Sequence, residues 1–266
     1  MSFSVRAIFA VFSLVVAIQP LQAQEQSTTS LLTDVNGDGQ VRILAFGDSL
    51  TYGVGDGIAS GVYVETPTLT DGTKGYPMRV EVISGVLVDN NGSPGETFSI
   101  DGVSRLVRAV LGSSADIVVF MEGTNDSFLQ INPTQYRILL QRVINVVKAL
   151  GRKVVVLTLP PTCCLHDGRE PYLNGYNFHI RDLANVNQVA IGDIDLAWYT
   201  SCVNKDECEF LNIPEGLHPN QLGYDVIAQV ILAALADIDL FALDGASQLE
   251  AAFGLTPGSV LVKPLS

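Results

Sequence analysis

The chain has 266 residues and a net charge of −13, because 28 acidic residues outnumber 15 lysines and arginines. This length suffices for one large domain with a substantial core. Proteins bind nucleic acid through a surplus of lysines and arginines, which replace the counterions of the phosphates. The acidic balance therefore excludes nucleic acid as an expected partner and disfavours adhesion to anionic lipid.

The N-terminus has the layout of a secretory signal. Arg6 precedes an apolar run over residues 7–18, and the small residue Ala23 comes just before a polar segment. The run is short for a membrane span, although an N-terminal membrane anchor is the alternative interpretation. We predict a signal peptide over residues 1–23, a linker over residues 24–40, and a secreted or periplasmic mature chain with no membrane span.

Apolar runs alternate with amphipathic segments between residues 41 and 236. The runs that we expect to form strands are residues 41–46, 86–89, 116–121, 154–159 and 189–194. The clearest helix begins at Pro133 after a capping Asn132 and ends at Gly151, and a last one follows Pro219. Apolar strands that are each followed by a helix predict an α/β fold, a three-layer α/β/α sandwich around a mainly parallel five-stranded sheet.

The chain has four cysteines, Cys163, Cys164, Cys202 and Cys208. Export makes disulfides plausible, and three arrangements stay open: bridges from the adjacent pair to the other two, a single local Cys202–Cys208 bond, or free thiols. Adjacent cysteines rarely bond each other without strain, because a disulfide requires their Cα atoms to be well separated. The sequence does not choose among these arrangements.

Neither a metal nor a cofactor is expected. No pair of cysteines has a histidine partner at the usual zinc-ligand spacing. Residues 34–39 match the opening of a calcium loop, but Ala45 stands at the twelfth position, where a bidentate glutamate is needed. A polar turn is the favoured interpretation of this segment.

Four short blocks carry the residues of a nucleophilic hydrolase. They are Gly47-Asp48-Ser49, residues 92–97, residues 123–126 and residues 215–218. The first and third blocks directly follow predicted strands. In a parallel sheet ligands bind beyond the carboxyl ends of the strands, so both blocks are expected at the edge that binds substrate.

Each block supplies a different part of the chemistry. Ser49 is the candidate nucleophile, and His218 is the candidate base that takes its proton. Glu215, three residues earlier, is placed to accept the other ring N–H of that histidine. The backbone N–H groups of Ser49 and Gly95 and the side-chain amide of Asn125 are candidate donors to an oxyanion.

The four blocks, in this order, resemble those of the SGNH, or GDSL, hydrolases. The resemblance covers residues 41–236, and residues 237–266 form a C-terminal extension of unknown role. It implies a flavodoxin-like fold and hydrolysis of carboxylic esters through an acyl-enzyme. It also implies Ser49 as nucleophile, Gly95 and Asn125 in the oxyanion hole with Ser49, and His218 as base.

The chain departs from the family pattern at Glu215, where the family has aspartate. The additional methylene requires the turn to open or the carboxylate to bend back. Glutamate is the acid in some unrelated triads. The alternative is a Ser–His pair whose third member is a backbone carbonyl. The other histidines, His166 and His179, are expected on a loop and on a helix surface, without a function.

We therefore predict an exported serine ester hydrolase that acts on short-chain acyl or acetyl esters of a small molecule or carbohydrate. A sugar O-acyltransferase of the same fold, which passes the acyl group to a different acceptor, is one alternative. A non-catalytic carbohydrate-binding module is the other. The fold alone does not choose among them, and the oligomeric state is not predicted.

Overall fold

The structure is a computed structural model that describes residues 30–67, 72–202, 204 and 207–265. The predicted signal peptide, residues 1–23, lies outside the described residues. The strands are β1 (Arg42–Gly47), β2 (Tyr63–Val64), β3 (Leu87–Gly92), β4 (Ile117–Met121), β5 (Lys153–Leu157), β6 (Ala190–Gly192) and β7 (Ile213–Pro214). The helices are α1 (Ser49–Tyr52), α2 (Tyr76–Ser84), η1 (Phe98–Gly102), α3 (Val103–Gly112), α4 (Thr124–Phe128), α5 (Pro133–Ala149), η2 (Cys164–His166), α6 (Glu170–Asn187), α7 (Ile194–Ser201), α8 (Gln221–Ala236) and α9 (Gly245–Phe253).

The main sheet has five parallel strands in the order β3-β1-β4-β5-β6. Ala45 on β1 pairs with Asn90 on β3 and with Val119 on β4. This strand order is that of flavodoxin-like folds, in which the chain changes direction across the sheet beside the first strand. The predicted fold class is confirmed.

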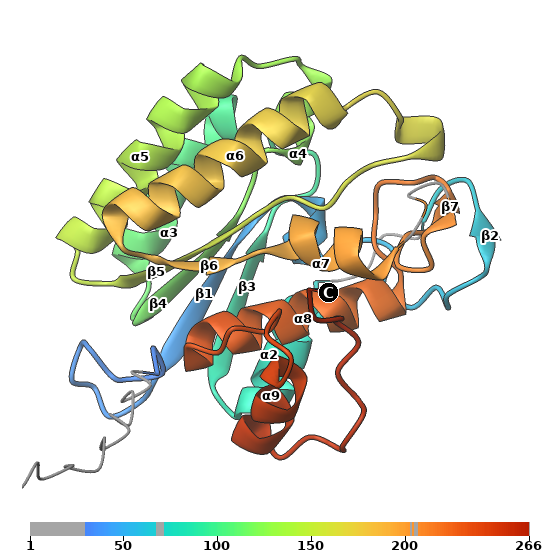
Figure 1. Cartoon of the computed structure of the whole chain (residues 1–266). Coiled ribbons are helices and arrows are strands. Elements are labelled where there is room, and N and C mark those ends of the chain that lie inside the picture. Colours follow the sequence, from blue (N-terminus) through green and yellow to red (C-terminus); the bar gives the residue numbers. More distant parts are fainter. Residues whose placement is uncertain (1–29, 68–71, 203, 205–206, 266) are drawn as a thin grey trace, which may run out of the picture.

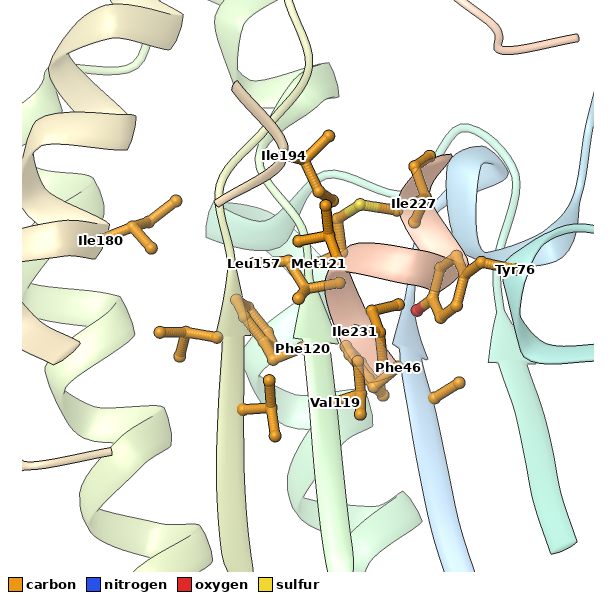
Figure 2. Close-up of a cluster of buried hydrophobic side chains, with 14 of the residues drawn as sticks. Phe46, Tyr76, Val119, Phe120, Met121, Leu157, Ile180, Ile194, Ile227 and Ile231 are labelled. Atoms are coloured by element: carbon orange, nitrogen blue, oxygen red, sulfur yellow. The ribbon is translucent and has the colours of Figure 1, made fainter. Parts of the chain in front are cut away.

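Helices cover both faces of the sheet (Figure 1). The helices α3, α5 and α6 lie on one face, and α2, α8 and α9 lie on the other. The core lies between these layers and the strands, and Figure 2 shows part of it around the buried residues Phe46, Phe120 and Leu157. Burial on both faces is the reason why these strands are continuously apolar in sequence.

The strands β1 and β4 agree with their predicted extents to within one residue, β5 ends at Leu157, two residues early, and the two edge strands differ in length. The strand β3 runs on to Gly92, beyond the predicted end at residue 89, and includes Asn90 and Asn91. It is an edge strand whose residues are exposed or half-buried, so it can contain polar residues. For this reason the apolar run in the sequence ends before the strand does. The strand β6, at the opposite edge, is shorter than predicted and spans only residues 190–192.

The terminal segments of the described chain pack against the domain. Leu31 donates its N–H to the carbonyl oxygen of Leu235 on α8, at 2.8 Å. Asp34 accepts N–H groups from Gly37 and Gly39, which forms the polar turn favoured for this segment. At the other end α9, which no sequence pattern predicted, packs on α8 and buries Leu249.

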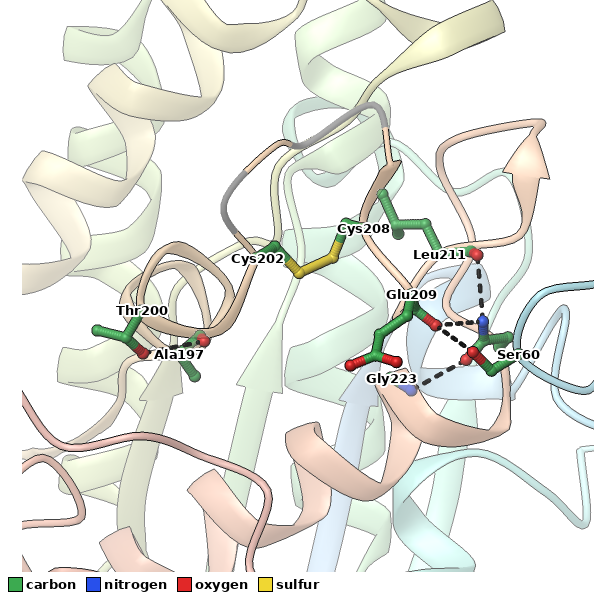
Figure 3. The surroundings of a disulfide bond; sticks show 9 residues. Ser60, Ala197, Thr200, Cys202, Cys208, Glu209, Leu211 and Gly223 are labelled. Atoms are coloured by element: carbon green, nitrogen blue, oxygen red, sulfur yellow. Dashed lines mark hydrogen bonds between the residues drawn. A yellow bond between two sulfur atoms is a disulfide. The ribbon is translucent and has the colours of Figure 1, made fainter.

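A disulfide joins Cys202 to Cys208, which is one of the three arrangements left open by the sequence (Figure 3). Cys163 and Cys164 lie apart from it, with their own sulfur atoms 2.6 Å from each other. Directly after the disulfide, the carbonyl oxygen of Glu209 accepts hydrogen bonds from Ser60 and Asn220. The segment directly after the disulfide therefore lies against both the loop after α1 and the start of α8.

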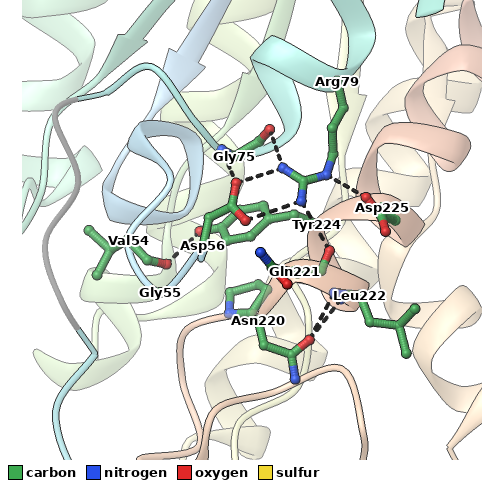
Figure 4. A network of polar contacts seen from close by, with 12 residues as sticks. Val54, Gly55, Asp56, Gly75, Arg79, Asn220, Gln221, Leu222, Tyr224 and Asp225 are labelled. Atoms are coloured by element: carbon green, nitrogen blue, oxygen red, sulfur yellow. Dashed lines mark hydrogen bonds and ion pairs between the residues drawn. The ribbon is translucent and has the colours of Figure 1, made fainter. Parts of the chain in front are cut away.

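A charged network holds the start of the loop after α1 (Figure 4). Arg79 on α2 binds the Asp56 carboxylate at 2.6 Å and the Asp225 carboxylate on α8 at 2.5 Å. The buried Asp56 also accepts the N–H of Gly75, and the Tyr224 hydroxyl donates to the carbonyl oxygen of Val54. These bonds fix the chain that follows α1 against α2 and α8, two helices of one layer.

Replacing Arg79 with methionine should lower the free energy of unfolding by about 3 kcal/mol, because the buried Asp56 carboxylate loses its charged partner. Arg137→Met is the matched control, since Arg137 and Asp182 form a pair whose side chains are 36% and 37% exposed. Its expected cost is below about 1 kcal/mol. Urea denaturation measures both, and an equal loss in the two variants would contradict the structural weight given to the Asp56 network.

Candidate active site

The candidate nucleophile, Ser49, stands where β1 ends and α1 begins. Asp48 caps this short helix, because its carboxylate accepts the N–H of Leu50 at 2.9 Å. The Ser49 hydroxyl lies 2.9 Å from Nε2 of His218. Ser49 is largely buried, and its own N–H lies in the first turn of α1, where backbone donors have no partner within the helix.

The candidate base and acid lie on one turn between β7 and α8. Nδ1 of His218 lies 2.8 Å from one carboxylate oxygen of Glu215. The second oxygen accepts the backbone N–H groups of Leu217 at 2.9 Å and of His218 at 2.8 Å. The longer glutamate side chain thus bends back onto its own turn, and in this way it reaches the histidine despite its additional methylene.

Glu215 is held in its ionised form. Burial on its own raises the pKa of this carboxyl, whose residue is only 3% exposed. Hydrogen bonds from the His218 ring and from the backbone of His218 and Leu217 outweigh burial, so the pKa of Glu215 lies below its ordinary value. An ionised carboxylate at this position orients the imidazole and stabilises the imidazolium that forms when a base takes a proton.

The turn that carries Glu215 is fixed from several sides. The backbone N–H of Glu215 donates to the carbonyl oxygen of Val64 on β2 at 3.1 Å. The N–H of Cys163 donates to the carbonyl oxygen of Gly216 at 2.9 Å. Gly216 has φ +76°, and a Cβ there would lie 2.3 Å from the carbonyl oxygen of Cys163. Only glycine allows this close approach of the two segments.

The two further predicted oxyanion donors lie beside each other. Ser93 to Glu96 form a tight turn with Pro94 second and Gly95 third, closed by a 3.1 Å bond from the Glu96 N–H to the Ser93 carbonyl oxygen. Gly95 has φ +79°, which marks a type II turn, the type that favours glycine at its third position. The Asn125 amide donates to the carbonyl oxygen of Glu96 at 2.7 Å, so the next residue of the turn positions that side chain.

Arg105 on α3 ties this turn to the nucleophile strand. Its guanidinium binds the Glu96 carboxylate at 2.6 Å and the carbonyl oxygen of Gly47 at 2.8 Å. It also lies over the ring of Phe46, 3.8 Å from the ring centroid. Glu96 lies in the predicted block of residues 92–97, but sequence reasoning assigned it no role and did not indicate Arg105, because nothing in their spacing pairs the two residues.

Buried carboxyl groups lie directly behind the nucleophile. Burial raises the pKa of Asp48 to about 7, although the Leu50 N–H and nearby His218 oppose the shift. Burial also raises the pKa of Glu122 well above its ordinary value, and the negative charge of Asp48 adds to the shift. The ionised form of either carboxyl group disfavours ionisation of the other, because their like charges repel.

The structure thus joins Ser49, His218 and Glu215 in one line of hydrogen bonds. It also holds the Asn125 amide against the turn that contains Gly95 and 3.5 Å from the carboxylate of Asp48, the neighbour of Ser49. His166 was expected to have no function, yet its ring lies against Glu215. A single histidine on a loop carries no pattern that could have indicated this contact. His179 lies on α6, as expected.

Within the described residues, no group of three or more histidine, cysteine, aspartate or glutamate side chains is arranged to hold a metal ion. In the same part of the chain, no helix has the length and apolar character that crossing a membrane requires.

An α/β fold with a Ser–His–Glu arrangement at the carboxyl ends of its parallel strands is typical of a nucleophilic hydrolase. The family model of the GDSL-like lipase/acylhydrolase family matches residues 45–226. The chain therefore belongs to this family, and the resemblance to SGNH, or GDSL, hydrolases is confirmed. None of the curated proteins compared with the chain matches its sequence.

Solved structures of GDSL-type and related hydrolases share the fold. The lipase/acylhydrolase from Enterococcus faecalis is 27% identical with a TM-score of 0.55, over 72% of this chain and 93% of that one. An aryl esterase from M. smegmatis is 21% identical with a TM-score of 0.58, over 73% and 96%. An acetyl xylan esterase from Geobacillus stearothermophilus is 20% identical with a TM-score of 0.57, over 73% and 94%.

The buried Asp48 predicts an unusual dependence of stability on pH. Because its pKa rises from 3.8 to about 7 on folding, the folded state binds the additional proton between these values. The contribution of Asp48 to the free energy of unfolding should therefore fall as pH rises from about 4 to about 7 and change little above that. Asp48→Asn keeps an oxygen to cap α1 but cannot ionise. The free energy of unfolding of this variant should therefore change less steeply with pH than that of the wild type, and Glu122 should account for the change that remains.

Urea denaturation across this pH range measures both slopes. An unchanged slope in Asp48→Asn would contradict the assignment of the raised pKa to Asp48.

Proposed function

We propose that the chain is an exported serine ester hydrolase that cleaves carboxylic esters through an acyl-enzyme on Ser49. The observation that carries the proposal is the unbroken line of hydrogen bonds from Ser49 through His218 to Glu215. A serine hydroxyl is a weak nucleophile unless a base accepts its proton, and a base is most effective when a carboxylate orients it.

The first half-reaction acylates the serine. Nε2 of His218 takes the hydroxyl proton while the Ser49 oxygen attacks the ester carbonyl carbon. The oxyanion is stabilised by the N–H groups of Ser49 and Gly95 and by the Asn125 amide, each worth about a hundredfold or more in rate. When the carbon–oxygen bond to the alcohol breaks, His218 gives its proton to the leaving alcohol.

The second half-reaction releases the acid. His218 takes a proton from water, the hydroxide attacks the acyl carbon, and the proton then returns to the Ser49 oxygen as the acyl bond breaks. Throughout, Glu215 stays ionised and accepts the hydrogen bond from Nδ1–H of His218, which is consistent with its lowered pKa. The two steps consume one water and regenerate the free enzyme.

For the substrate we propose a short acyl or acetyl ester of a carbohydrate or of another small alcohol. Structural likeness to an acetyl xylan esterase and to an aryl esterase is consistent with this class, although their identities of 20% and 21% support only the fold. Secretion is proposed on the signal-like residues 1–23, and the Cys202–Cys208 disulfide fits an oxidising compartment.

Hydrolysis of p-nitrophenyl esters from acetate to palmitate should be fastest at short chain lengths. Ser49→Ala should lower kcat by about a thousandfold or more, because no other hydroxyl is hydrogen-bonded to His218 among the described residues. Including a sugar acceptor distinguishes hydrolysis from acyl transfer through the products formed. Unchanged turnover in Ser49→Ala would contradict the proposed nucleophile, and polysaccharide binding without any turnover would favour the non-catalytic module.

A further inference from the structure

A second histidine contacts the catalytic acid. Nδ1 of His166, at the end of η2, lies 2.6 Å from the backbone carbonyl oxygen of Glu215 and 3.5 Å from one of its carboxylate oxygens. Both partners offer only lone pairs, so the ring must donate from Nδ1. His166 therefore holds a proton at Nδ1 while it makes this contact, and its orientation is fixed by the acid's own backbone.

The imidazole of His166 is held in place by its surroundings. Its ring meets the ring of Phe128 edge-on, with the centroids 5.5 Å apart, and the Arg169 guanidinium stacks over that phenylalanine. The backbone N–H of His166 donates to the carbonyl oxygen of Cys163 at 2.8 Å. Only 26% of the histidine side chain is exposed. The ring is thus pre-organised toward Glu215.

The contact with His166 compensates for the greater flexibility of the glutamate side chain. Glutamate has one more rotatable bond than aspartate, so its carboxylate is harder to fix in one position. The backbone of residues 215 and 216 is bound by Val64, by Cys163 and by the His166 ring. Removing the ring donor leaves the Glu215 carbonyl, in a residue that is 3% exposed, without that hydrogen bond.

We propose that His166 is a positioning residue for the catalytic acid: its Nδ1–H fixes the Glu215 backbone so that the longer carboxylate reaches His218. The inference rests on the proposed function, in which Glu215 orients the base. His166 touches neither Ser49 nor the ring of His218 in the contacts described, so it acts through Glu215.

Two polar replacements separate the role of Nδ1 from that of the ring as a whole. The amide nitrogen of asparagine can replace Nδ1, whereas that of glutamine falls where Nε2 lies. His166→Asn should keep kcat within about threefold of the wild type, and His166→Gln should lower it about tenfold at nearly constant KM. His179→Gln, on α6, is the matched control and should leave kcat unchanged. Equal kcat in the Asn and Gln variants would overturn the proposal.

A double-mutant cycle tests whether His166 acts through Glu215. In a Glu215→Ala background, His166→Gln should cause no further loss of kcat, because the acid that it positions is already gone. A merely structural histidine would cost the same factor in both backgrounds. That result would overturn the inference while leaving the proposed function intact.

A readout independent of turnover keeps the two proposals apart. The downfield proton NMR resonance of the His218 Nδ1–H···Glu215 hydrogen bond should be present in the wild type and His166→Asn and shifted or lost in His166→Gln. A resonance that is unmoved in His166→Gln overturns the role of His166. If this resonance responds as expected but turnover does not depend on Ser49, the proposed function fails and the positioning role stands.

Discussion

The hydrogen bond between Glu215 and His218 is the interaction on which the candidate site depends. It fixes which ring nitrogen of His218 carries the proton and leaves Nε2 to accept one from Ser49. The same carboxylate accepts two backbone N–H groups of its own turn, so its position is tied to that of the histidine backbone. One buried, ionised group therefore organises the residues of the candidate site.

The parallel sheet brings these residues together from distant parts of the chain. Ser49 follows β1 and Asn125 follows β4, so both emerge at the carboxyl ends of neighbouring strands. Arg105 binds the turn of residues 93–96 to the end of β1, and Arg79 binds Asp56 in the loop that follows α1. The charged side chains around the candidate site are thus held in place by the fold, and the proposed stabilisation of an oxyanion requires such fixed groups.

Much of this arrangement could be predicted from sequence, because the strands buried on both faces are continuous apolar runs. His218 could be predicted because the chain has only three histidines, and Ser49 because its block directly follows a predicted strand. The polar part of β3 and the helix α9 could not, since an edge strand lacks an apolar run and a nine-residue helix has a short apolar stripe.

Other features depend on tertiary geometry that no spacing encodes. The sequence showed Glu215 where the family has aspartate, but its reach depends on how the turn folds the carboxylate back. The contact of His166 with that turn joins residues 49 positions apart. The choice of Cys202–Cys208 among the possible disulfides likewise depends on distances between loops. Each of these features becomes visible only when the chain is folded.

The most direct test is to compare kcat/KM of Glu215→Gln and Glu215→Asp with that of the wild type on a short-chain p-nitrophenyl ester. Glutamine removes the charge at constant length and should lower kcat/KM by about a hundredfold or more, whereas aspartate keeps the charge and should retain much of the activity. Full activity in Glu215→Gln would contradict a carboxylate as the third member and would favour a Ser–His pair oriented by a backbone carbonyl.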